Sequence, residues 1–182
     1  MRINLGKKTW MFPLPVLIIG TYGEDGTPNA MNAAWGGIYD YNKIIISLSK
    51  HRTTDNLELK KAFTVSFATK KTVAASDYVG VVSGSKVPNK VEKAGLHPIK
   101  SEFVDAPLFE EYPLSLECRV DSFEDGILIG EIVNVSCDES IMTDGNIDLE
   151  KLEAIAFDPA NNKYVLVKGD VADAFKIGLS IK

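Results

Sequence analysis

The chain is poor in residues that hold metals, because its 182 residues include only two cysteines, Cys118 and Cys137, and two histidines, His51 and His97. Neither cysteine belongs to a CxxC pair, and neither histidine lies in an HExxH or mixed Cys/His spacing. We therefore expect no metal site. Both cysteines lie in apolar, strand-like surroundings, which predicts two buried thiols.

Long apolar runs and an excess of positive charge are also absent. Runs such as residues 16–19 and 127–129 are far too short to span a bilayer, and residues 1–8 lack the apolar stretch of a signal peptide. The net charge of −5 argues against a nucleic-acid or anionic membrane partner, since neutralising phosphates needs clustered cations. We expect a cytoplasmic protein whose basic residues act at a local site.

Several signatures of hydrolases and nucleotide-binding proteins are missing. The sequence has no GxSxG elbow and no GxGxxG turn, and the SGSK run at residues 83–86 lacks the P-loop spacing, so no phosphate loop is assigned there. Hydrolysis by paired carboxylates has little support, because the acidic residues are scattered over expected strand ends and turns. These residues are Asp121, Glu124, Asp138, Glu139 and Asp144.

Short strands dominate what is present. Residues 15–22 and 27–35 flank a Glu-Asp-Gly turn, and residues 114–120 and 127–135 flank a second one, so each pair predicts a β-hairpin. Residues 44–49 and 63–68 predict two further strands.

Short helices are expected over residues 57–62 and 72–81, the first capped by Thr53 or Thr54 and the second by Thr72. This pattern is not the regular alternation of a doubly wound sheet. It favours one domain over residues 1–182, built as a small, partly closed antiparallel barrel. Residues 83–98 are rich in Pro, Gly and Lys and predict an irregular functional loop.

The run SKHRTTDN at residues 49–56 is the strongest candidate for a binding site. It places hydroxyl groups and two cations at the point where an apolar strand gives way to a helix. Free N–H groups and partial positive charge at a helix N-terminus favour a phosphate, and an arginine adds a bidentate fork. The alternative is an ordinary threonine cap beside solvated charges. The candidate phosphate ligands are Ser49, Arg52, Thr53 and Thr54, and the choice among them stays open. Asn56 is a further candidate contact of the cofactor.

Several motifs in order resemble the flavin reductase-like, flavoredoxin-type FMN-binding proteins over nearly the whole chain. They are PVLIIGT at residues 15–21, NAMNAAW at 29–35, the 49–56 run, YVGVVSG at 78–84, Asn89-Lys90, and Phe157-Asp158-Pro159 followed by Tyr164. The resemblance implies a mainly β fold, an antiparallel split β-barrel with a few short flanking helices. It also implies a homodimer with one FMN per subunit near the dimer interface.

The resemblance implies further flavin contacts outside the 49–56 run. Asn29 and Trp35 match flavin contacts, while Asn32 and Ala33 lie in the same motif and suit the edge and the flat face of a flavin ring. For Trp35, core packing is the alternative. Lys90 would place a cation near the ring, with an exposed surface lysine as the alternative. Phe157 would turn an aromatic ring toward the flavin, or would be a core residue beside a turn.

The function expected from these features is an FMN-dependent oxidoreductase that takes hydride from NADH or NADPH and passes electrons to a second, small-molecule or protein acceptor. Without GxGxxG, the nicotinamide would dock only transiently. The main alternative is a flavoredoxin-type electron carrier with a protein partner and no reaction with NAD(P)H. A barrel that holds a phosphorylated ligand or haem without turnover is the third.

Overall fold

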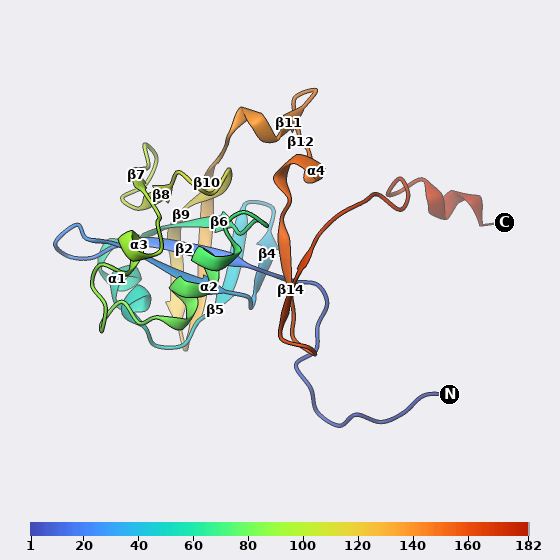
Figure 1. Ribbon diagram of the computed structural model, residues 1–182, viewed down its shortest axis with the longest axis horizontal. Coiled ribbons are helices and arrows are strands. Elements are labelled where there is room, and N and C mark those ends of the chain that lie inside the picture. The colour runs from blue at the N-terminus through green and yellow to red at the C-terminus, as the bar shows by residue number, and fades with distance from the viewer. Residues whose placement is uncertain (182) are drawn as a thin grey trace.

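A computed structural model describes residues 1–181, and its central element is a seven-stranded antiparallel sheet in the order β3-β2-β6-β9-β10-β5-β4 (Figure 1). Its strands are β2 (Leu17–Tyr22), β3 (Pro28–Ala33), β4 (Gly36–Asp40), β5 (Lys43–Ser47), β6 (Ala62–Phe67), β9 (Leu114–Glu124) and β10 (Ile127–Cys137). The outer strands β3 and β4 are joined by only Ala34 and Trp35. Such a short link draws the two edges of the sheet together, so the sheet curls into a partly closed barrel.

Smaller elements surround this barrel. The helices are α1 (Arg52–Lys60), α2 (Val73–Val81), α3 (Lys90–Lys93) and α4 (Leu149–Leu152), with 3-10 turns at Glu139–Ile141 and Ile177–Ser180. The minor sheets are β1 (Leu14–Pro15) with β13 (Ile155–Asp158) and β14 (Lys163–Leu166), β7 (Pro98–Lys100) with β8 (Pro107–Phe109), and β11 (Met142–Thr143) with β12 (Asn146–Ile147). No helix within residues 1–181 is long and apolar enough to cross a membrane.

Both expected hairpins are confirmed. In the second, Asp125 and Gly126 have φ values of 49° and 79°, the positive pair that a two-residue type I′ turn requires. The first joins β2 to β3, but its return strand ends at Ala33 and leaves Trp35 outside the strand.

The core lies on both sides of β2, as the continuous apolar run at this strand suggests. Leu17 and Ile19 point into the barrel with Phe63 and Leu128. Ile18 points the other way and packs with a second cluster beneath α2 and α3, which includes Val79 and Val91. Burial on both faces explains why the sequence of β2 does not alternate.

The structure corrects three expectations about local structure. The first helix begins earlier, with His51 rather than Thr53 or Thr54 at the N-cap position, and ends at Lys60, so that Ala62 belongs to β6. The expected irregular loop at residues 83–98 contains α3. Cys118 is buried as predicted, and burial raises its pKa to about 12, but Cys137 is exposed at the end of β10.

Candidate functional site

The N-terminus of α1 faces a cleft, which we call the basic pocket. The chain leaves β5 and enters the helix through His51, whose N–H donates to Thr54 Oγ1 (3.1 Å), while that hydroxyl donates to the carbonyl of His51 (2.7 Å). Thr54 therefore closes the first turn of its own helix. Thr53, one residue earlier, is buried and points into the pocket wall, where its Oγ1 accepts a hydrogen bond from Asn29 Nδ2 (2.8 Å).

The basic pocket has a volume of about 180 Å³ and brings together three segments distant in sequence: β3, the start of α1, and the end of α2 with the loop that follows it and the first residue of α3. Cationic, hydroxyl and amide groups converge there, with no carboxylate among them, and this chemistry suits an anion. The lining residues are Asn29, Met31, Asn32, His51, Arg52, Thr53, Val79, Gly80, Val81, Val82, Ser83, Gly84 and Lys90.

Arg52 lines the basic pocket beside the loop after α2. Its Nη1 reaches the carbonyl of Gly84 at 3.4 Å, a long hydrogen bond, and its positive charge adds a small share to lowering the pKa of Asp25 in the β2–β3 turn. The hydrogen bonds from Thr27 lower that pKa more strongly. The guanidinium has five N–H donors and few of them are engaged in hydrogen bonds within the protein, so it retains N–H groups for a ligand.

Lys90 is buried at the back of the pocket, with 4% of its surface exposed. Its Nζ donates to the carbonyls of Val79 (3.1 Å) and Val82 (3.0 Å), where α2 ends and partial negative charge collects. Burial, and then the charge of Arg52, lowers its pKa to about 8. An ammonium group has three donors, so one remains for a ligand. The expected alternative of an exposed lysine is wrong.

Two glycines let the backbone approach the pocket. A Cβ on Gly84 would lie 2.5 Å from Asn29 Oδ1 and 3.4 Å from Lys90 Cε, and a Cβ on Gly80 would lie 2.9 Å from Asn32 Cβ. Any larger residue at either position would push into the wall formed by the functional side chains. The last turn of α2, which contains Gly80, and the loop that follows, which contains Gly84, therefore fit against β3 and α1 only because these positions lack side chains.

A second cleft, which we call the aromatic pocket, continues from the basic pocket along β3. It measures about 260 Å³, and the two clefts share Asn32, Gly80 and Val81. The rings of Phe157 and Tyr164, from β13 and β14, pack 6.0 Å apart at its wall.

Hydrogen bonds join the aromatic pocket to α2. Tyr164 donates from its hydroxyl to Asp77 Oδ1 at 2.7 Å, and Asn32 Nδ2 donates to the carbonyl of Ser76 at 3.1 Å. Burial, and then Asp77, raise the pKa of Tyr164 to about 12, so this hydroxyl stays protonated and keeps its donor role at neutral pH. The small sheet is thereby tied to the helix that borders both clefts.

The structure brings only part of the expected set together. Asn29, Asn32, Arg52, Thr53 and Lys90 all line the basic pocket. Phe157 lines the aromatic pocket near the end of β13 and also packs, half-buried, against the second core cluster, so both of its expected roles are compatible with the structure.

The other expected residues lie elsewhere. Ser49 is exposed before the helix, Thr54 closes the first helical turn, and Asn56 is buried, where it donates to Thr21 Oγ1 at 2.9 Å. Ala33 packs into the barrel core. Trp35 is 57% exposed, so core packing is wrong for it, and it borders a separate apolar cleft.

Several residues that line the two pockets are not among the candidates, and those with the most direct bearing on the site are His51, Ser83, Gly84 and Tyr164. His51 stood inside the recognised run, and its N-cap position was the available signal. Ser83 and Gly84 were set aside with the SGSK run, which is not a P-loop but still borders the basic pocket. Tyr164 was visible only as the last residue of a motif, because its partner Asp77 is distant in sequence.

These features define a partly closed antiparallel barrel with a groove along one outer strand, basic at one end and aromatic at the other. The profile of the family described as the flavin reductase like domain matches residues 9–150, and the chain belongs to that family.

Solved structures agree with this assignment. The flavoredoxin of Desulfovibrio vulgaris (Miyazaki F) is 36% identical, with 98% of this chain and all of that chain covered and a TM-score of 0.94. The flavoredoxin from Methanosarcina acetivorans is 25% identical over all of both chains, with a TM-score of 0.90.

An FMN-binding domain of a flavin reductase-like enzyme from Shewanella baltica is 18% identical and shares the fold, with a TM-score of 0.79 over 87% of this chain and 88% of that one. The expected split β-barrel is confirmed.

Proposed function

We propose that this protein binds FMN along β3 and acts as an FMN-dependent oxidoreductase. The observation that carries the proposal is the union of the two pockets at Asn32, Gly80 and Val81, because it offers one groove to a ligand with an anionic end and a flat aromatic end. The family, and the two flavoredoxins that the chain resembles over nearly its full length, support the same ligand.

The residues of the basic pocket fit the phosphate of FMN. Arg52 retains free guanidinium donors, Lys90 retains one ammonium donor, and the hydroxyl of Thr53 accepts from Asn29 and so keeps its own proton for donation. Charge-assisted hydrogen bonds of this kind contribute about 1.5–3 kcal/mol each. The N-terminus of α1 adds its partial positive charge.

The residues of the aromatic pocket fit the ring. Ala34 and Gly80 leave room for a flat group beside the backbone, and Phe157 and Tyr164 form a wall that excludes water from one side. The Oδ1 atom of Asn32 is free to accept a hydrogen bond, because the amide nitrogen of that side chain is the atom that bonds to α2. The protein would thus hold the ligand at both ends.

Bound FMN would supply the redox chemistry, accepting hydride from NADH or NADPH and releasing electrons to a second acceptor. The protein's share is to hold the phosphate, position the ring and shield one face. With no dinucleotide-binding turn in the sequence, the nicotinamide would dock on the open side of the ring.

A second candidate is an electron carrier that exchanges electrons with a protein partner and does not oxidise NAD(P)H. The specific observation in its favour is the 36% identity to a flavoredoxin over 98% of the chain. The two candidates share the flavin site and differ only in the electron donor.

The visible spectrum separates these possibilities. The purified protein is incubated with FMN, freed of excess flavin and titrated without oxygen with NADH, then NADPH, then dithionite, with free FMN at equal concentration as the control. Bleaching by a nicotinamide faster than in the control supports the reductase, and bleaching by dithionite alone supports the carrier. A preparation that retains no flavin contradicts both.

A further inference from the structure

The C-terminal segment after β14, residues 168–181, which we call the C-terminal arm, carries apolar side chains that nothing covers in the described chain. Val171 is 100% exposed, Phe175 97% and Leu179 84%, and Ile177 and Ile181 are exposed as well. Figure 1 shows the arm, in red, running outward from the barrel. Leaving this many large apolar groups in water is unfavourable, and such a patch marks an interaction surface.

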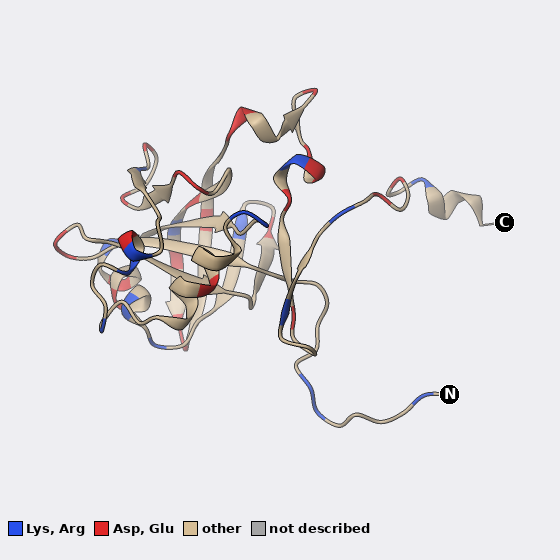
Figure 2. Cartoon of the chain, in the orientation of Figure 1, with Lys and Arg blue, Asp and Glu red and all other residues tan. Residues whose placement is uncertain are grey.

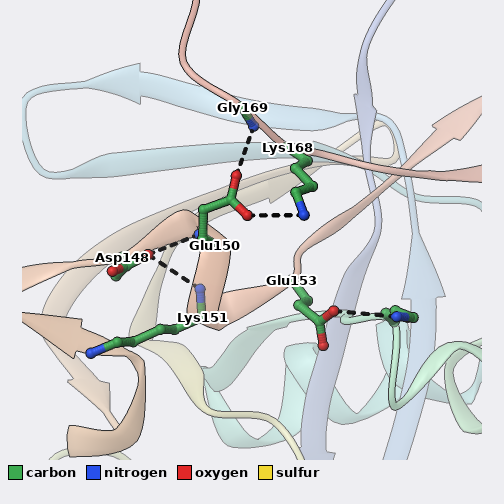
Figure 3. Close-up of polar contacts among 7 residues, drawn as sticks. Asp148, Glu150, Lys151, Glu153, Lys168 and Gly169 are labelled. Carbon is green, nitrogen blue, oxygen red and sulfur yellow. Dashed lines mark hydrogen bonds and ion pairs between the residues drawn. The ribbon is translucent and has the colours of Figure 1, made fainter.

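The base of the C-terminal arm is held in a defined direction. Glu150 of α4 accepts a hydrogen bond from the backbone N–H of Gly169 (3.2 Å) on one carboxylate oxygen and pairs with Lys168 Nζ (3.2 Å) on the other (Figure 3). Just before it, Val167 N–H donates to the carbonyl of Ala154 at 2.8 Å. Within residues 1–181, the hydrogen bonds of the arm beyond Gly169 stay inside the arm. The arm is therefore aimed away from its own barrel.

The same molecule carries an apolar cleft of about 510 Å³ on the outer face of the sheet, which we call the outer groove. Ile44 and Ile46 of β5 point into the barrel core, so Ile45 and Ser47 point outward into this groove. The N-terminal segment forms its other wall. The lining residues are Lys8, Thr9, Trp10, Met11, Leu14, Trp35, Gly36, Ile45, Ser47 and Ile127.

We propose that the outer groove receives the C-terminal arm of a second copy of this chain, and that two copies exchange arms reciprocally. The arm and the outer groove are both apolar, and the arm extends away from its own barrel, so a second copy supplies the matching surface for each. In a two-fold symmetric dimer, the exchange of arms would cover the C-terminal arm and the outer groove of each copy at the same time. The proposal goes beyond the proposed function and does not depend on flavin binding.

The exposed area is sufficient for a stable dimer. Each copy offers five apolar side chains on the arm, and in the outer groove it offers four exposed ones: Trp10, Met11, Trp35 and Ile127. If each of these nine side chains buries on the order of 100 Å², the contact buries about 900 Å² per copy. This area is close to the roughly 800 Å² per partner of a standard interface.

Charge does not oppose the contact. The charges of Lys168, Asp170, Asp173 and Lys176 on the arm sum to zero, and the charged side chains of residues 1–12 are all basic (Figure 2). The two carboxylates of the arm would therefore approach a positively charged segment.

The first test is the mass of the full-length protein by light scattering and sedimentation. We expect a dimer, and we expect the double variant Phe175→Asp with Leu179→Asp to raise the dissociation constant at least about a hundredfold, since each buried apolar side chain is worth about tenfold or more. Leu59→Asp, at an exposed leucine of α1 outside both surfaces, is the matched control and keeps the wild-type value. A monomeric wild-type protein overturns the proposal.

The second test shows which copy contributes the arm, and it does not depend on the folding of the aspartate variants. In a Cys137→Ser background, Ile127→Cys is mixed with Phe175→Cys, Ile177→Cys or Leu179→Cys in turn, and oxidised glutathione is added. A disulfide between two different chains supports exchange. The proposal is overturned if a disulfide forms only when both substitutions are on one chain and the product has the mass of a single chain. It is also overturned if the protein is a dimer but none of these cysteine pairs forms a cross-link.

Discussion

The pKa of Lys90 predicts how FMN binding depends on pH. In the free protein this pKa is about 8, lowered by burial and then by Arg52. A phosphate dianion beside the third ammonium donor would raise it again, so the complex binds more protons than the free protein. The affinity for FMN is therefore greatest well below pH 8 and falls as the pH rises through 8, because free Lys90 must then regain a proton to bind the phosphate.

The magnitude follows from the same value. At pH 9.5, 1.5 units above the pKa, about one free molecule in thirty still carries the charged lysine, so the dissociation constant should rise about thirtyfold, or about 2 kcal/mol. The loss should be about fourfold at pH 8.5. These values assume that the pKa in the complex stays above 9.5.

The assay is quenching of flavin fluorescence on titration with protein between pH 7.5 and 9.5, where the phosphate stays fully ionised. Lys90→Met should bind more weakly at pH 7.5 and show a flat profile. A flat wild-type profile, or an equally steep profile in Lys90→Met, would refute the role given to this ammonium.

Three further predictions concern the same site. Arg52→Ala should weaken FMN binding about tenfold to a hundredfold, because one charge-assisted interaction is lost. Lys50→Ala, at an exposed neighbouring residue, should change the binding less than twofold. Equal effects of the two substitutions in equilibrium dialysis would contradict the assignment. Gly84→Ala should impair flavin binding while far-ultraviolet circular dichroism stays unchanged, because its Cβ would lie 2.5 Å from Asn29 Oδ1; undiminished binding would show that the loop can give way. The folded-state pKa of Lys90 lies below its usual 10.5, so the flavin-free protein binds fewer protons when folded than when unfolded, and its stability should rise between pH 8 and 10.5. The melting temperature of the wild type, measured relative to that of Lys90→Met, should therefore rise over this interval. A constant difference between the two melting temperatures would count against the buried charge.

Local chemistry determined much of the fold from sequence alone. In both hairpin turns the glycine of the Asp-Gly pair has positive φ, which few other residues adopt, and the alternation of residues 114–120 marked the strand observed at Leu114–Glu124. The helix Val73–Val81 was found at nearly its observed bounds. These features depend on neighbours within a few residues, which the sequence displays directly.

Helix and strand boundaries at the site were less accessible. Thr53 and Thr54 are residue types that favour the N-cap position, yet the observed N-cap is His51, two residues before Thr53, and Thr53 instead forms a hydrogen bond with Asn29 on β3. Trp35 had the size and apolarity of a core residue, but the short link between β3 and β4 leaves it on the outside. In each case a contact distant in sequence overrode a local preference.

Lys90 shows most clearly what only the tertiary structure decided. The sequence left a choice between a flavin contact and a surface charge, and the fold places this lysine beneath the end of α2, bound to the carbonyls of Val79 and Val82. The fold likewise joins Arg52, Asn29 and Gly84 around one cleft. Sequence determines which groups can bind an anion, but burial, charge and direction depend on packing between segments that the sequence holds far apart.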